Sequence, residues 1–331
     1  LDFMFFHGLL PSYAFPTDVA SFLIEKTKER KVLVEERPQQ AIAAALSEYA
    51  PGRIVVVNKK SYRVGGITAD CLPTTYDRAS GLFAKSMYVR HCGRCNHVEE
   101  VTNQDYESRD QMELECPVCG DNLFTESVLK PEVFHPEDGR QLRESDTDQE
   151  ITYATYAQFP IPEDATNQFQ FALAGKKVSA TYGEDCKLIT LNRGALVNEE
   201  ATGFNVCKKC GRSSTKPQSG SHTRPYFPEY NFKERYSKQC DGEFENVYLG
   251  HDFSTDLLLL RFDIDDPVAS DISHIGNLRI IEDALYSVSE ALKIAASTHP
   301  QLDLDDSEFG VGFRVVPKTE TSNLAFDVYL Y

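Results

Sequence analysis

The chain has 331 residues, enough for two or three modest domains. Its hydrophobic fraction of 41%, with 11% aromatic residues, excludes an intrinsically disordered chain, and its net charge of −17 excludes a uniformly nucleic-acid-binding surface. No apolar run approaches the roughly 18 residues of a membrane span. The apolar start, Leu1 to Phe6, lacks the basic segment and the cleavage site of a signal peptide. We therefore expect a cytoplasmic protein with no membrane partner.

Both ends of the sequence interrupt an apolar pattern. Residue 1 is not Met, and the segment from Leu324 to Tyr331 alternates like a strand with no polar tail after it. Natural termini are usually polar and frayed. We therefore expect that the sequence is a piece of a longer polypeptide.

The first 90 residues predict a mixture of strands and one helix. Val19 to Ile24 is a short apolar segment that predicts a strand, and Pro38 to Tyr49 predicts a helix with Pro near its first position. The segments 53–57 and 62–67 predict a β-hairpin. A further strand over Ser86 to Arg90 leads into a cysteine-rich segment.

Two C-x2-C pairs separated by twenty residues follow this strand, and they are Cys92, Cys95, Cys116 and Cys119. This spacing is typical of a tetrahedral four-cysteine Zn²⁺ site in a zinc-ribbon-like module. Gly93 and Gly120 suit the positive φ angles of such turns, and Pro117 presets φ. Two disulfides are the competing interpretation, which the odd total of nine cysteines and the missing secretory signal disfavour. Seven acidic and two basic side chains lie between the outer cysteines, so the module is acidic.

The rest of the chain predicts a β-rich α+β fold. Residues 131–150 are polar and acidic, and we expect an acidic linker or long surface loop there. A helix is predicted over Ile275 to Ser297, where apolar residues recur at three and four. Strands are predicted over 151–156, 169–173, 177–182, 188–191, 247–249, 256–262, 310–316 and 325–330.

A second knuckle, Cys207-Lys208-Lys209-Cys210-Gly211, supplies two metal ligands. Because a zinc site needs four, we favour His222 and Cys240 as the others, with Cys186 as the substitute for His222. The alternative is that Cys207 and Cys210 are reduced, unligated thiols. We expect the chain to have four segments. Residues 1–85 form a linker or α+β segment, and residues 86–130 form the zinc-ribbon-like module. Residues 131–150 form the acidic linker or loop, and residues 151–331 form a β-rich zinc-binding domain that contains the second knuckle and one long helix.

The second cysteine segment is also the basic part of an acidic chain. Eight cations stand against two anions between Cys207 and Cys240, and five aromatic residues are interleaved. Cations neutralise phosphates and aromatic rings stack on unpaired bases, so this segment is the best nucleic-acid candidate. The alternative is a solvated loop whose charges pair with acidic neighbours and whose aromatic rings belong to the core. The candidate cations are Lys208, Lys209, Arg212, Lys216, Arg224, Lys233, Arg235 and Lys238.

Two other groups of residues are weaker candidates for a functional site. His251, Asp252 and Asp256 suggest a catalytic group, but adjacent strand residues alternate faces, so we expect a turn followed by a buried strand. The acidic run 303–308 lacks the glycine and the final glutamate of a calcium loop. No phosphate-binding loop, nucleophile elbow or H-E-x-x-H motif is present, so we expect no catalysis by this chain itself.

Several segments together resemble one family. They are Gly8 to Pro16, Leu46 to Gly52, the Cys207 to Cys210 knuckle, and Leu249-Gly250-His251 running to Asp256 and Arg261. The chain resembles the region C-terminal to the motor in DEAD/DEAH-type superfamily 2 helicases, including the zinc-binding domain of the mitomycin-repair helicases. Similar regions occur in anti-phage systems such as DISARM and Druantia.

The resemblance implies a motor, with its ATP, before Leu1. It also implies a metal site using Cys207, Cys210 and Cys240. The mitomycin-repair type uses four cysteines, so His222 as a ligand would be a departure. In the family, an Asp and a glycine-rich segment usually follow the strand that matches Ala325 to Tyr331, and this sequence stops before them.

We therefore expect a non-catalytic, zinc-binding accessory region of an ATP-dependent DNA helicase or translocase, in anti-phage defence or DNA repair. Its partners would be DNA, the motor in the same polypeptide or complex, and other defence subunits. The alternative is a protein-interaction scaffold that touches no nucleic acid. A third hypothesis is a nuclease or hydrolase that uses His251 and nearby acids.

Overall fold

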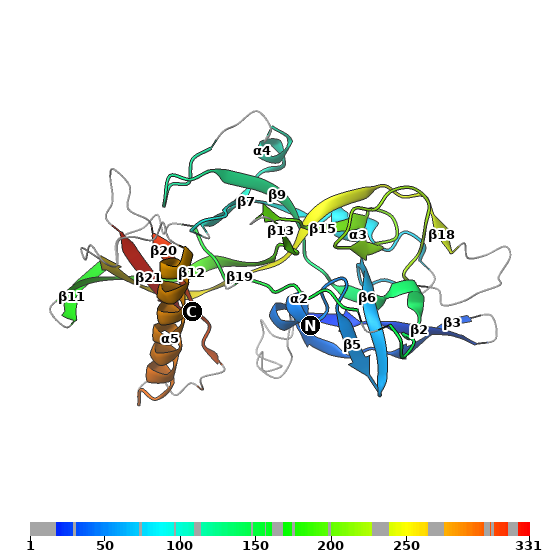
Figure 1. Cartoon of the computed structure of the whole chain (residues 1–331), viewed down its shortest axis with the longest axis horizontal. Coiled ribbons are helices and arrows are strands. Elements are labelled where there is room, and N and C mark those ends of the chain that lie inside the picture. The colour runs from blue at the N-terminus through cyan, green and yellow to red at the C-terminus, as the bar shows by residue number, and fades with distance from the viewer. Residues whose placement is uncertain are drawn as a thin grey trace, which may run out of the picture. The chain divides into compact units, whose positions relative to one another are not determined.

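The computed structural model describes residues 18–28, 31–72, 75–95, 97–108, 114–146, 148–155, 157–160, 168–173, 176–197, 200–226, 238–263, 275–300, 305, 308–316 and 324–331. The segment 8–16 that contributes to the family resemblance lies outside these residues. The fold is the predicted strand-rich α+β type (Figure 1).

The described residues form two compact units, each assembled from three separate stretches. Unit 1 takes its residues from 1–87, 127–154 and 191–251, and unit 2 takes its residues from 88–126, 155–190 and 252–331. These interleaved units differ from the four contiguous segments that we predicted.

Unit 1 is built on a five-stranded sheet in the order β4-β1-β10-β6-β5. β10 runs parallel to β1 and antiparallel to β6. The strands are β1 (Val19–Phe22), β4 (Gln39–Ala41), β5 (Ile54–Val57), β6 (Lys60–Thr68) and β10 (Val133–Pro136). Helices α2 (Ile42–Glu48) and α3 (Ser80–Phe83) and the 3₁₀ turn η3 (Glu137–Gly139) join them.

Short strand pairs complete unit 1. β2 (Ile24–Lys28) pairs with β3 (Lys31–Glu36) as an isolated two-stranded ribbon. The other pairs are β13 (Leu196–Val197) with β14 (Glu200–Ala201), β15 (Phe204–Cys207) with β16 (Ser213–Ser214), and β17 (His222–Thr223) with β18 (Gln239–Cys240).

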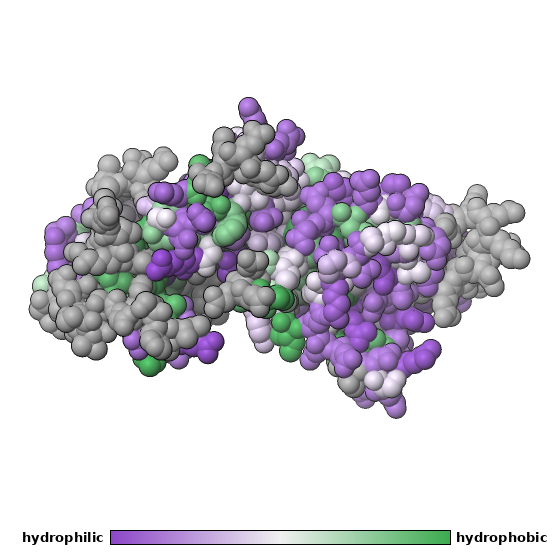
Figure 2. All heavy atoms as spheres, turned by 45° about the horizontal axis from the view of Figure 1, so that its top comes forward, coloured by the Kyte–Doolittle hydropathy of each residue, from purple (hydrophilic) through white to green (hydrophobic). Residues whose placement is uncertain are grey.

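The core of unit 1 is aromatic and aliphatic. Phe22 and Tyr49 pack at 5.5 Å between ring centroids, and Tyr49 meets Phe134 edge-on at 5.7 Å. Phe204 and Leu249 belong to the same buried cluster, although their strands lie late in the chain. Figure 2 shows that hydrophilic residues cover most of the visible face of this unit.

We predicted an acidic linker or long surface loop over residues 131–150. This prediction is wrong for the start of the segment, which forms a strand. Val133–Pro136 forms β10, every residue of which is buried inside the sheet of unit 1. The acidic residues that suggested a loop follow this strand, in η3 and in the segment that returns along Arg63. The composition of the whole segment therefore hid four buried residues at its start.

Unit 2 contains the strands β8 (Val98–Val101), β11 (Gln168–Leu173), β20 (Val311–Val316) and β21 (Ala325–Leu330), and all of β7 (Met87–Cys92) except Met87. Three long strands contribute residues to both units, and they are β9 (Leu123–Leu129), β12 (Lys176–Asn192) and β19 (Phe244–Asp263). Within unit 2, β21 lies between β19 and β20, and β7 pairs with β8.

Helix α5 (Ile275–Ser297) has the bounds predicted from its apolar periodicity, and α4 (Asn103–Glu107) is a single turn with a capping box at Thr102. In Figure 1, α5 lies beside β20 and β21, and Leu285 packs against Val315 and Val328 there. Within the described residues no helix combines the length and the apolarity that crossing a membrane requires.

Several predicted strands are longer than expected, and one is absent. The segments 177–182 and 188–191 are both parts of β12, and 247–249 and 256–262 are both parts of β19. The turn predicted at His251 is therefore wrong, because β19 continues through it. Residues 151–155 form only an isolated bridge between Ala154 and Asn192, rather than a strand.

Candidate metal centres and their supporting network

The first predicted cysteine set converges in unit 2. The Sγ atoms of Cys92 and Cys119 lie 3.5 Å apart, and those of Cys95 and Cys116 lie 3.4 Å apart. All four sulfurs lie within 4.8 Å of one another and all four residues are buried. None of the nine cysteines forms a disulfide, so the competing interpretation of two disulfides is not supported.

The local turns of this cluster explain the choice of residues. The amides of Arg94 and Val118 donate to the sulfurs of Cys92 and Cys116, each at 3.4 Å. Gly120 has a φ of +74°, as predicted, whereas Gly93 does not adopt a positive φ. Val316 and Ala325, from β20 and β21, pack against the sulfurs and shield them from water.

The second predicted set converges in unit 1 and uses His222. The sulfurs of Cys207 and Cys240 lie 3.8 Å apart, and the sulfur of Cys210 lies 3.4 Å from Nε2 of His222. The four ligand atoms again lie within 4.8 Å of one another. The predicted substitute, Cys186, lies elsewhere, in unit 2 beside a separate apolar cluster.

A backbone hydrogen bond fixes the form of the His222 ring. Nδ1 of His222 lies 2.8 Å from the carbonyl oxygen of Gly220. A carbonyl can only accept, so Nδ1 carries the proton and Nε2 presents a lone pair toward the three sulfurs. This is the outer hydrogen bond that metal-binding histidines usually make.

The second knuckle is fastened to the sheet of unit 1. The carbonyl of Gly211 accepts a hydrogen bond of 2.8 Å from the amide of Ile67 in β6. Gly211 has a φ of +76°, and a Cβ there would lie 1.8 Å from the Ile67 oxygen. Gly242, which sequence reasoning missed, would place a Cβ 2.6 Å from the sulfur of Cys207. Its position two residues after Cys240 was the available signal.

Within each cluster, hydrogen bonding and burial shift the pKa values of the cysteines in opposite directions. The neighbouring Cys210 thiol and nearby backbone amides lower the pKa of Cys207 to about 4, and the pKa of Cys210 rises because its proton is held against Cys207. In the first cluster, hydrogen bonds from Cys116 and Cys95 lower the pKa of Cys92, and burial raises the pKa of Cys119 to about 12. A bound cation would displace these remaining protons.

The spacing of the ligand atoms suits a metal ion. Tetrahedral Zn²⁺ with Zn–S bonds near 2.3 Å places its sulfurs about 3.8 Å apart, and a sulfur and an imidazole nitrogen about 3.5 Å apart. The measured separations of 3.4 to 3.8 Å fall close to these values. Each group of four residues could therefore hold a metal ion, and the geometry is compatible with zinc.

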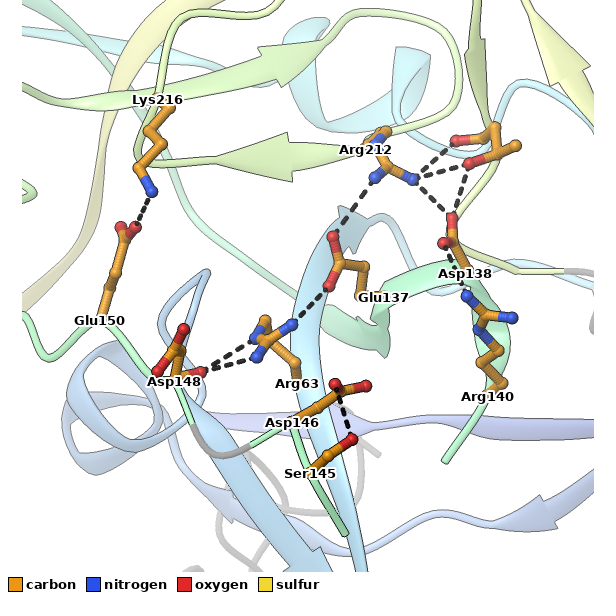
Figure 3. A network of polar contacts seen from close by, with 11 residues as sticks. Arg63, Glu137, Asp138, Arg140, Ser145, Asp146, Asp148, Glu150, Arg212 and Lys216 are labelled. Carbon is orange, nitrogen blue, oxygen red and sulfur yellow. Dashed lines mark hydrogen bonds and ion pairs between the residues drawn. The ribbon is translucent and has the colours of Figure 1, made fainter. Parts of the chain in front are cut away.

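Acidic residues of unit 1 pair with the described cations of the basic segment. Arg212 contacts Asp138 at 2.7 Å, and Thr223 donates to the same carboxylate at 2.6 Å (Figure 3). The other ion pairs are Lys208–Glu245 at 2.5 Å, Lys209–Asp241 at 3.1 Å, Lys216–Glu150 at 3.1 Å and Arg224–Asp77 at 3.5 Å. Lys238 adds to the positive field around Asp138, and Lys233 and Arg235 lie outside the described residues.

Figure 3 shows that the contacts of Arg212 extend into a network. Glu137 lies between Arg212 and Arg63, at 3.4 and 3.3 Å, and Arg63 also donates to the carbonyl of Asp148. The network borders a polar pocket of about 360 Å³. Burial alone would raise the pKa of Asp138, but hydrogen bonds from Thr223 and Arg212 lower it. Sequence reasoning missed these acidic partners, because they precede Arg212 by more than seventy residues.

Of the five aromatic residues in the basic segment, the structure describes one, Tyr226, and places it in the core. Tyr226 is buried, and the guanidinium of Arg78 lies 3.9 Å from its ring centroid. It belongs to the apolar cluster around Cys207, Cys210 and Cys240. The other four aromatic residues, at positions 227, 230, 232 and 236, lie outside the described residues.

The carboxylates beside His251 make other contacts. Asp252 pairs with Lys187 at 3.1 Å, and Asp256 accepts a hydrogen bond of 2.8 Å from Tyr182. His251 itself is buried in β19. These contacts give the catalytic hypothesis no support.

An ion triad supports unit 2 near the first cluster. Asp327 is fully buried, and Arg261 and Arg314 contact it at 2.6 and 2.8 Å. The three residues stand side by side on β19, β21 and β20. Arg261, which contributed to the family resemblance, therefore has a structural partner that sequence reasoning missed.

The chain is similar over its whole length to Druantia protein DruE of Escherichia coli (strain UMEA 4076-1), with 45% identity over 341 aligned positions. The alignment covers 100% of this chain and 18% of that relative, so the chain spans less than a fifth of its length. No model of a protein family and no solved structure matches the chain. The predicted resemblance to proteins of Druantia is thus confirmed, and the resemblance to helicase zinc-binding regions stays a prediction.

Proposed function

We propose that this chain is a zinc-binding, non-catalytic accessory region of a larger anti-phage defence protein, and that it helps an ATP-dependent motor to hold DNA. The observation that carries the proposal is the pair of buried Cys/His clusters in a chain that is similar throughout to Druantia protein DruE. The match to 18% of that relative leaves room for a motor elsewhere in a longer protein. Zn²⁺ would fix the knuckles, and DNA contact would be made by exposed cations.

Metal analysis tests the first part of the proposal. We expect two zinc ions per chain, and one ion after either Cys95→Ser or Cys210→Ser. Cys186→Ser is the matched control, because Cys186 lies outside both clusters and should leave both ions bound. A chain purified with no zinc, or with two ions that survive both ligand substitutions, would refute the metal assignment.

Nucleic-acid binding tests the second part. Fluorescence polarisation with labelled duplex and single-stranded DNA should show binding that weakens steeply as salt rises, because cations release counterions from phosphates. Absence of binding at low salt would reject direct DNA contact.

A protein-interaction scaffold is the second candidate, and one observation favours it. The described cations of the basic segment, Lys238 apart, are ion-paired within unit 1, which reduces the charge available to DNA. Under this candidate, DNA affinity is absent while assembly with other defence subunits depends on the acidic module 92–119. Co-purification of the larger protein and its partners, with and without charge reversal of Glu99 and Glu100, would distinguish the two candidates.

A further inference from the structure

The ribbon formed by β2 and β3 has one basic face. Lys28 stands directly opposite Lys31, and Lys26 stands opposite Leu33. Residues two apart on a strand, and residues directly opposite across an antiparallel pair, share one face. Lys26, Lys28, Lys31, Leu33 and Glu35 therefore lie on the same face of this ribbon.

The neighbouring hairpin of β5 and β6 extends this basic face. Lys60 and Lys26 approach the same oxygen of Glu35, at 3.8 and 3.9 Å. Asn58 donates to Glu36 at 2.6 Å, so the turn of this hairpin lies beside the end of β3. Lys59 follows in this turn, near the end of the ribbon that carries Glu35 and Glu36, whereas Lys28 and Lys31 pair at the opposite end of the ribbon.

The cations of these hairpins are less neutralised than those of the basic segment. Lys28, Lys31 and Lys59 are exposed and make no ion pair with any described residue. Like charges placed directly opposite each other, as Lys28 and Lys31 are, destabilise a strand pair. An anion bound across them would remove this repulsion.

The opposite face of the ribbon is held by the second cluster. Val32 packs against the buried group of Cys207, Cys210, Tyr226 and Cys240. Glu25 pairs with Arg78 at 2.9 Å, with both side chains almost fully buried. One face of the ribbon therefore packs against the second cluster, and the lysines lie on the other, exposed face.

We propose that the outer face of β2–β3, together with the turn at Lys59 and Lys60, binds the sugar-phosphate backbone of DNA. This inference rests on the proposed function and relocates its DNA contact from the basic segment to the two hairpins. The face carries lysines and the exposed side chain of Leu33, and lysines contact phosphates as point charges. Binding should therefore be independent of base sequence.

The test compares three pairs of substitutions in the full 331-residue chain. Lys28→Ala with Lys31→Ala should lower DNA affinity roughly tenfold or more at low salt, and reduce the slope of log affinity against log salt by about two. The matched control is Lys85→Ala with Lys130→Ala, an exposed and a half-buried lysine of unit 1 that already pair with Glu132 and Asp18. Lys208→Ala with Lys209→Ala probes the basic segment. Thermal unfolding checks that all variants remain folded.

The outcomes separate this inference from the proposed function. Loss of affinity in the hairpin pair alone supports the inference. If the wild-type chain binds DNA and the hairpin pair binds it equally well, the hairpin surface is wrong while DNA binding stands. If the wild-type chain binds no DNA at low salt, both fail. Binding of polyglutamate through Lys28 and Lys31 in that case would assign the face to an acidic protein partner instead.

Discussion

At the scale of single residues, the two clusters depend on glycines at equivalent positions with different surroundings. Gly120 and Gly211 each follow the second cysteine of a knuckle, and their φ angles are +74° and +76°. A Cβ on Gly120 would meet open space, whereas one on Gly211 would lie 1.8 Å from the oxygen of Ile67. The same turn thus has open space beside its glycine in unit 2, whereas in unit 1 it packs directly against β6.

This difference predicts unequal costs for the same substitution. Gly120→Ala should lower the free energy of unfolding by about 1–2 kcal/mol, the cost of a left-handed conformation. Gly211→Ala should cost roughly 3 kcal/mol or more, because the knuckle must also move away from β6. Denaturant titration of the two zinc-loaded variants measures both values. Equal destabilisation would contradict the packing of Gly211 against β6.

Asp327 gives a prediction that depends on pH. Burial alone would raise its pKa, but hydrogen bonds and charge from Arg261 and Arg314 lower it. A carboxylate with a depressed folded pKa stabilises the protein above its unfolded pKa of about 3.9, and this contribution is lost as pH falls toward the folded value. Asp327→Asn should therefore cost roughly 3–5 kcal/mol at neutral pH, and less below about pH 4.

The control for Asp327 is Asp70→Asn, which breaks an exposed pair with Arg37. That change should cost under about 1 kcal/mol. Unfolding measured across the pH range would contradict the triad if the two variants behaved alike.

At the scale of elements, a helix or strand could be predicted from the sequence where its own residues show a regular apolar periodicity. The apolar spacing between Ile275 and Ser297 placed α5 at its bounds, and the β5–β6 hairpin followed from two apolar runs. β10 was missed because four buried residues begin a polar segment and are held by neighbours distant in sequence. Polar residues at the centre of β19 likewise concealed its continuity.

In the candidate sites too, some residues could be predicted from the sequence and others could not. Spacing predicted the eight residues of the two clusters, including His222, because knuckle ligands lie within a short stretch of chain. The partners of Arg212 and Arg261 could not be predicted from sequence, since Glu137, Asp138 and Asp327 reach them through sheet pairing and tertiary packing. Lys26 and Lys28 are spaced in the period of a strand, and that signal was available but unused.

The β5–β6 hairpin offers a stabilising substitution. Asn58 and Lys59 both have positive φ, at 48° and 65°, as a two-residue type I′ turn requires. Lys59→Gly should raise the free energy of unfolding by roughly 0.5 kcal/mol, because glycine adopts this conformation without steric cost. Lys60→Gly, one residue further and inside β6, should instead lower it by about 0.5–1 kcal/mol. Thermal unfolding of both variants tests the turn.

At the scale of the whole molecule, each cluster belongs to one of two compact units, so loss of each metal should act on a different set of strands. Cys210→Ser should increase amide hydrogen exchange in unit 1, including β2 and β3, because Val32 packs on the second cluster. Cys95→Ser should increase exchange in β20 and β21, because Val316 and Ala325 pack on the first cluster. Mass spectrometry resolves the two responses, and a uniform increase in either variant would contradict separate support.

The interleaving of the two units also orders events during synthesis. Unit 1 draws residues from three stretches that end at position 251, and Cys240 is among the last of them. A ribosome that adds 5–20 residues per second needs about 2–6 s to extend the chain from Cys210 to Cys240. During this interval Cys207 and Cys210 lack their third cysteine, whereas Cys119 has already completed the first set. The first cluster can therefore bind metal while unit 1 is still incomplete, whereas the second cluster has all its ligands only when unit 1 is almost fully synthesised.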